Sequence, residues 1–253
     1  MTTVTTPDGT AEAWLARPDD DQAHPGVLFV MDAIGLRPRI HEMADRIASW
    51  GYVVLAPNVF YREGSAAETS PDGPLDTAEK REAFFDVAMP RVGRLTPDLA
   101  LRDIAAYLDA LTGRDDVLTP VGVTGYCMGA RIALRAACAH PDLVAACGGW
   151  HGGGLATEGD DSPHLGLPSA RARFSFGHAD QGRQGGVAGN VIFPAVAAIG
   201  PSQQERQIAG MRELGRTAEA AMTGIETAQH EIAPQPDRRI VQAIQPGLAG
   251  MTG

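Results

Sequence analysis

One short segment constrains the fold of this chain more than any other: an apolar run, a glycine-flanked cysteine and a helical pattern follow one another directly. Val121–Thr124 is typical of a buried strand and Met128–Ala139 of a helix, so only three residues are left to connect them. A turn this tight needs small residues two places before and after its centre, and Gly125 and Gly129 supply them. The segment predicts a parallel-sheet protein with Cys127 at the carboxyl edge of the sheet.

The predicted turn also indicates that Cys127 could act as a nucleophile. Its side chain would face the N-terminus of the next helix, whose dipole and free N–H groups favour a thiolate. The N–H of Met128 could then point at a developing oxyanion. Two simpler interpretations are a glycine-rich turn with a small buried cysteine, and a dinucleotide loop, which would need glycine in place of Cys127. The other two cysteines, Cys138 and Cys147, are predicted to be core residues.

Strand-like and helix-like segments alternate along residues 1–180, which predicts an α/β fold with a mostly parallel sheet and helices on both faces. Thr96 before Pro97 marks a helix start, whereas residues 61–74 are polar and predict a loop. The predicted strands are 2–6, 11–16, 26–31, 52–56, 121–124, 143–147 and 172–176, and the predicted helices are 39–50, 97–111 and 128–139.

Charge, hydropathy and cysteine content exclude several classes of protein. A net charge of −10 argues against nucleic acid or an anionic membrane as the main partner. No apolar run approaches the ~20 residues of a membrane helix, and the first residues lack the features of a signal peptide. Three widely spaced cysteines suit a reducing compartment, so we expect a cytoplasmic protein. No histidine pair has metal-ligand spacing, and no metal is expected.

The composition changes near residue 181. Thirteen of the 14 aromatic residues lie before this point, and Phe193 is the exception; nine of the ten glutamines lie after it. The sequence thus predicts a core over residues 1–180 and an atypical tail over 181–253. In the tail, 191–196 could be an edge strand, because Pro194 cannot donate to a sheet, and a capped helical pattern begins at Ser202.

Four motifs stand out in residues 1–180: MDAIG at 31–35, GYVVLAP at 51–57, GYCMG at 125–129 and GHAD at 177–180. Together they resemble the dienelactone hydrolase family of α/β-hydrolases, the carboxymethylenebutenolidases and their relatives. The resemblance implies the α/β-hydrolase fold. It also implies hydrolysis of enol-lactones and related small esters through a Cys–His–Asp triad, without a metal or organic cofactor.

The resemblance also implies roles for individual residues. Cys127 would be the nucleophile and Asp180 the triad acid that orients the histidine. Asp32 stands where the family usually has a glutamate that contacts the resting cysteine. The backbone N–H groups of Ala33 and Met128 would form the oxyanion hole. Either aspartate could instead be a helix cap, Asp32 for the helix that starts near Pro38.

Two further residues are candidates for contacts with the substrate. Arg81 could pair with a substrate carboxylate, as a family arginine does, or it could lie on a solvated helix face. His151 follows a predicted strand at the catalytic edge, where it could line the pocket. The expected partner is a small-molecule ester or lactone, and the protein is expected to be a monomer or a weak homo-oligomer.

The tail departs from the family pattern. The family's histidine follows the last strand beside a glycine or alanine, but here the one histidine after Asp180 is His230, in a helical context. One hypothesis is that residues after about 182 derive from a shifted reading frame or a recombined end. The other is a divergent tail that covers the pocket or mediates association. The chain would accordingly be a cysteine hydrolase, or alternatively a catalytically impaired member that binds a ligand or partner.

Overall fold

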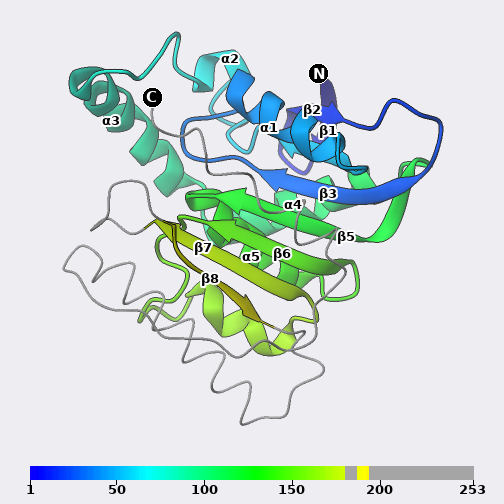
Figure 1. Cartoon of the computed structure of the whole chain (residues 1–253). Coiled ribbons are helices and arrows are strands. Elements are labelled where there is room, and N and C mark those ends of the chain that lie inside the picture. The colour runs from blue at the N-terminus through cyan, green and yellow to red at the C-terminus, as the bar shows by residue number, and fades with distance from the viewer. Residues whose placement is uncertain (180–186, 194–253) are drawn as a thin grey trace. The chain divides into compact units, whose positions relative to one another are not determined.

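Residues 1–179 and 187–193 are described by a computed structural model of the chain (Figure 1). The chain divides into two compact units, one built on Met1–Val121 and the other beginning at Gly122. Strand β5 (Val117–Tyr126) begins in the first unit and ends in the second. Each unit combines strands with helices, as the alternating sequence pattern predicts.

The first unit contains four consecutive strands of the sheet, in the order β1-β2-β4-β3. β1 pairs antiparallel with β2, and β2 pairs antiparallel with β4. β3 and β4 are parallel, and both are almost entirely buried, which explains their continuous apolar sequences. The bounds are β1 Thr2–Thr6, β2 Gly9–Ala16, β3 His24–Val30 and β4 Val53–Pro57.

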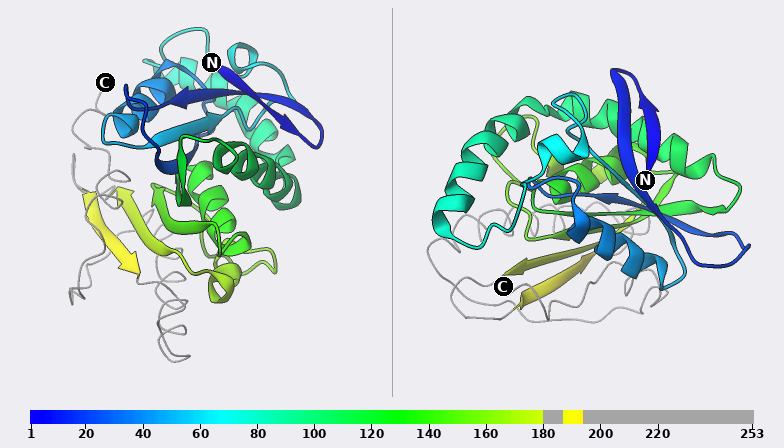
Figure 2. Two further views of the ribbon diagram at one scale, coloured as in Figure 1. Left: turned by 90° about the vertical axis from the view of Figure 1, so that its right-hand side faces the viewer. Right: turned by 90° about the horizontal axis from the view of Figure 1, so that it is seen from above.

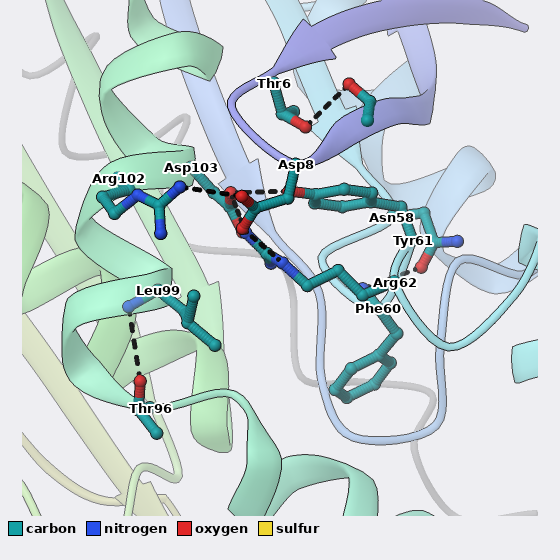
Figure 3. A network of polar contacts seen from close by, with 11 residues as sticks. Thr6, Asp8, Asn58, Phe60, Tyr61, Arg62, Thr96, Leu99, Arg102 and Asp103 are labelled. Carbon is teal, nitrogen blue, oxygen red and sulfur yellow. Dashed lines mark hydrogen bonds and ion pairs between the residues drawn. The ribbon is translucent and has the colours of Figure 1, made fainter.

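Helices α1 (Pro38–Ala48) and α4 (Pro97–Thr112) lie on opposite faces of these strands (Figure 2). α1 packs on β2 and β4, and α4 packs on β1, β3 and β4. The predicted start of α4 is confirmed, because the Thr96 side chain accepts a hydrogen bond from the Leu99 N–H (Figure 3). Both helices bury one apolar stripe, so the predicted coverage of both sheet faces is present in this unit.

A cluster of ion pairs joins three segments of the first unit (Figure 3). The guanidinium of Arg62 donates to both carboxylate oxygens of Asp103 at 2.7 and 2.8 Å, and to Asp8 at 2.7 and 2.9 Å. Arg102 also donates to Asp8, and the Tyr61 hydroxyl donates to Asp103. The Asp103 side chain is only 2% exposed, so Arg62 compensates a buried charge. The cluster ties the β1–β2 turn and the segment after β4 to α4.

The second unit holds the end of β5, then α5 (Met128–Ala139), β6 (Val144–Trp150), β7 (Arg173–Ala179) and β8 (Val187–Phe193). These strands follow the order β5-β6-β7-β8, with β6 and β7 parallel and β8 antiparallel to β7. A 3-10 helix, Pro163–Ser169, packs against α5. Together the two units have the predicted α/β class, with a mixed, mostly parallel sheet.

Several details differ from the sequence prediction, among them the ends of β6 and β7, which lie three residues beyond the predicted ones. The predicted loop over 61–74 contains a short helix, α2 (Ala66–Thr69), because Ser65 and Glu68 cap its first turn reciprocally. A 17-residue helix, α3 (Ala78–Arg94), has no predicted counterpart, and β5 begins four residues earlier than predicted. β8 ends at Phe193, just before Pro194. The helix predicted from Ser202 lies outside the described residues.

None of the described helices combines the length and the apolar character that crossing a bilayer requires.

Candidate active site

The connection between β5 and α5 is a single residue in a strained conformation. Cys127 has φ 54° and ψ −119°, between the last residue of β5 and the first of α5. A Cβ atom at Gly125 would lie 2.2 Å from the carbonyl oxygen of Gly129, so only glycine fits this crossing. The structure therefore has the strand–turn–helix geometry predicted for this segment. Strained backbone at a non-glycine residue is a common mark of a functional site.

The turn is held against the end of β6. The Cys127 N–H donates to the carbonyl oxygen of Trp150 at 2.9 Å. A Cβ at Gly152 would lie 2.7 Å from the Cβ of Ala130, and one at Gly149 would lie 3.2 Å from the same atom. The first turn of α5 thus sits directly on a glycine-rich strand end. Sequence analysis missed these contacts, although the runs of glycine around Trp150 are a visible signal.

The three thiols differ in their surroundings. Cys127 is partly exposed at the turn. Cys147 is 1% exposed, which confirms its predicted place in the core, and burial raises the pKa of its thiol well above the usual range. Cys138 is half-buried against Gly166, and desolvation raises the pKa of its thiol to about 12. Neither Cys138 nor Cys147 is therefore a good nucleophile near neutral pH.

His151 lies directly after β6, in the same unit as Cys127. Its backbone has φ 39°, and its N–H donates to the carbonyl oxygen of Gly177 at 2.7 Å. The exposed imidazole lies 5.7 Å from the ring of Tyr126, centroid to centroid. Two strained residues, Cys127 and His151, therefore stand at the ends of neighbouring strands, β5 and β6.

Asp32 and Ala33 lie in the first unit, in the loop between β3 and α1. The Asp32 carboxylate accepts two hydrogen bonds from the guanidinium of Arg37, at 2.7 and 2.9 Å, and a third from the Ile34 N–H at 2.9 Å. The alternative that Asp32 caps α1 is wrong, because the N-cap is Arg37 and makes no side-chain cap bond. Sequence analysis missed Arg37; the opposite charges at positions 32 and 37 were the available signal.

Arg81 lies in the first turns of α3, with an exposed side chain that donates to the carbonyl oxygen of Leu75 at 3.0 Å. This placement agrees with the solvated-helix alternative. A contact between Arg81 and a substrate carboxylate stays a prediction.

The candidate residues belong to two different units of the chain. Cys127, Met128 and His151 share the second unit, whereas Asp32, Ala33 and Arg81 belong to the first. Asp180 and His230 lie outside the described residues. Over the described ranges, no three carboxylate, histidine or cysteine side chains form a group that could hold a metal ion.

Comparison with known proteins gives concordant matches. The sequence profile of the Dienelactone hydrolase family matches residues 11–184. A Yersinia pestis protein provisionally named carboxymethylenebutenolidase is 28% identical over 155 residues, which are 60% of this chain and 52% of that protein. The carboxymethylenebutenolidase of Rhodococcus opacus is 29% identical over 141 residues, which are 56% of this chain and 49% of that protein. The chain thus spans about half the length of the curated relatives it matches.

A solved structure supports the fold. The crystal structure of a provisionally assigned dienelactone hydrolase from Klebsiella pneumoniae is similar to this chain with a TM-score of 0.59 and 19% sequence identity. The similarity covers 85% of this chain and 80% of that one. The predicted α/β-hydrolase fold is confirmed by this likeness.

Proposed function

This chain belongs to the dienelactone hydrolase family, and from that premise we propose that it hydrolyses small esters or lactones through a thioester on Cys127. The observation that carries the proposal is the geometry of Cys127, a partly exposed thiol in a strained turn at the start of α5. This position favours a thiolate and offers backbone N–H groups to an anion.

The proposed reaction has two steps. The Cys127 thiolate attacks the substrate carbonyl carbon; a C–S bond forms and the carbonyl electrons move onto oxygen. The N–H of Met128 stabilises this oxyanion, with the Ala33 N–H as the second donor that the family resemblance implies. When the oxyanion collapses, the C–O bond breaks: an ester releases its alkoxide, whereas a lactone ring opens and its alkoxide or enolate stays attached to the acyl group. Water then attacks the thioester, and the acid leaves with the thiol regenerated. This second step needs a base to take a proton from the water.

The proposed substrates are small and carry a carboxylate. An enol-lactone suits the site because its leaving group is a stabilised enolate, which needs little help from an acid. Arg81 is the proposed partner of the carboxylate, and His151 the proposed pocket-lining contact. The proposed core over residues 1–180 would hold the reacting residues, with Asp180 as the triad acid.

A second candidate function is favoured by one feature of the sequence: His230 is the single histidine that follows Asp180. If no histidine acts as base on the Cys127 thioester, acylation would occur once and deacylation would be slow. Such a chain would bind a ligand or partner through the same pocket without turnover. The tail over residues 181–253, of divergent or frame-shifted origin, is the proposed cause.

The two functions are separated by the time course of p-nitrophenyl acetate hydrolysis. We expect a burst of one p-nitrophenolate per chain, with the acetyl group found by peptide mapping on Cys127. A steady rate after the burst supports the hydrolase, and a burst alone supports the impaired member. Cys127→Ser should abolish the burst, whereas Cys138→Ser, a matched change of a half-buried thiol, should keep it. Acetylation of all three cysteines at similar rates would contradict the proposal.

A further inference from the structure

The end of β6 places His151 opposite Cys127, and both residues belong to the second unit. β5 and β6 are neighbours in the sheet and are joined through α5, the connection typical of parallel strands. Between β6 and β7, Trp150 pairs with Gly177, and the N–H of the next residue, His151, donates to the Gly177 carbonyl oxygen. The Cys127 N–H donates to the Trp150 carbonyl oxygen with the same offset, so Cys127 is in register with His151.

The imidazole of His151 lies beside the last residue of β5. Its ring is 5.7 Å from the ring of Tyr126, centroid to centroid, and Tyr126 directly precedes Cys127. A Cβ at Gly152 would lie 3.5 Å from the Cys127 carbonyl oxygen, so the chain that follows His151 also contacts the turn. Neighbouring strands lie about 4.8 Å apart, and side chains on facing residues can therefore reach the same water molecule.

The backbone of His151 is strained in the same way as that of Cys127. Within the described ranges, these two are the non-glycine residues with positive φ, at 39° and 54°. Such conformations cost about 1–3 kcal/mol each and cluster at active sites. Glycine would adopt φ 39° without the crowding of a Cβ atom. What histidine adds at this position is therefore its imidazole.

Two other histidine side chains described in the second unit are placed differently. His140 follows the last residue of α5, about 18 Å along the helix axis from its start at Cys127. His164 is 1% exposed, and its Nδ1 shares a hydrogen bond of 2.7 Å with the Ser162 hydroxyl. His151, by contrast, is exposed at the same strand ends as the thiol.

We propose that His151 is the general base that hydrolyses the thioester on Cys127, an inference that rests on the proposed function. Its imidazole takes a proton from a water molecule while the water oxygen attacks the thioester carbonyl carbon. The C–S bond then breaks, the acid leaves, and the imidazolium returns the proton to the Cys127 sulfur. The base would thus come from the end of β6 and not from a segment after the last strand.

The test separates the burst of p-nitrophenyl acetate hydrolysis from the steady rate in the full-length chain. His151→Gly removes the imidazole and suits the positive φ. It should keep a burst of one p-nitrophenolate per chain and accumulate acetylated Cys127, whereas its steady rate should fall about 10²- to 10⁴-fold. Added imidazole should restore part of the steady rate, because glycine leaves room for it. Alkylation of Cys127 by iodoacetamide should stay within about twofold, since the base acts on water and not on the thiol.

His140→Gln is the matched control, because it removes a histidine of the same unit at the far end of α5. It should change neither the burst nor the steady rate. His151→Asn is the second variant, since asparagine tolerates positive φ but cannot take a proton from water. It should lose the steady rate as His151→Gly does, which tests the same point if glycine loosens the strand end.

Several outcomes would overturn the inference. It fails if both His151 variants turn over as fast as His140→Gln, or if His178→Gln or His230→Gln stops the steady rate and they do not. It also fails if alkylation slows as much as the steady rate, which would place the effect on the thiol. A wild-type burst without a steady rate would refute the base alone and leave acylation of Cys127 intact. Wild type that is alkylated but never acylated would refute the proposed function itself.

Discussion

Replacing Gly125 with alanine tests the turn around Cys127 directly. The added Cβ would lie 2.2 Å from the carbonyl oxygen of Gly129 and 2.3 Å from its carbonyl carbon. Ordinary van der Waals contact between heavy atoms begins at about 3.5 Å, so the backbones of β5 and α5 must separate by more than about 1 Å. Both atoms belong to the backbone, so no side-chain rotation can relieve the clash.

The expected cost lies at the upper end of the range for overpacking, about 3 kcal/mol. For a domain of this size that corresponds to a fall in melting temperature of roughly 6–12 °C. Urea denaturation should show a lower midpoint for Gly125→Ala. Its Cys127 should also lose its preferential labelling by iodoacetamide, because the thiol leaves its place at the α5 N-terminus.

Gly153→Ala is the control for this experiment. A Cβ at Gly153 meets nothing within 4 Å, and the residue lies just after the strand that supports the turn. Its free energy of unfolding should be unchanged or up to about 1 kcal/mol higher, because alanine restricts the unfolded chain. Equal urea midpoints and equal labelling of Cys127 in Gly125→Ala and Gly153→Ala would refute the close crossing of β5 and α5.

Two further predictions concern stability. Asp103→Asn should lower the free energy of unfolding by about 3 kcal/mol in urea denaturation, because it leaves the Arg62 guanidinium without its buried counter-charge. Asp109→Asn, an exposed change on the same helix, is the control and should leave the urea midpoint unchanged. Equal urea midpoints for the two variants would show that the Arg62–Asp103 pair contributes nothing to stability. His41 stacks on Trp14 at 4.1 Å, and burial lowers its pKa below 6.5, so the folded chain favours neutral His41. The stability that neutral His41 contributes is present above pH 6.5 and is lost as the pH falls through the lower pKa of the folded state. The difference in the free energy of unfolding between wild type and His41→Gln should therefore shrink from pH 7 to pH 5. A constant or growing difference would contradict this prediction.

Local signals in the sequence were enough to predict some elements closely. Helix α5 begins and ends where predicted, because the glycine-flanked turn sets its start and Pro141 restricts the residue before it. β5 was predicted too short, because Pro120 interrupts its pattern and prolines rarely occur inside strands. The bounds of α3 were not predictable from periodicity, because Ala88 is the one residue that this helix buries.

In the candidate site, too, some features could be predicted from the sequence and others could not. The geometry of Cys127 follows from four neighbouring residues, so the sequence could predict it. The pairing of Asp32 with Arg37 depends on how the intervening turn closes, and nothing in the spacing of the two charges specifies that closure. Gly149 and Gly152 were visible in the sequence, but their role depends on contact with Ala130 of α5, which lies 19 and 22 residues earlier in the chain.

The ion cluster around Arg62 also constrains the order of events during synthesis. Arg62 leaves the ribosome 41 residues before Asp103, its buried partner. At about 5–20 residues per second, that interval is about 2–8 s. Until Asp103 arrives, Arg62 can pair with Asp8 alone, so the β1–β2 turn is tied to the segment after β4 but not yet to α4. The cluster therefore closes last, when α4 brings the buried Asp103 carboxylate to a guanidinium that already holds the turn.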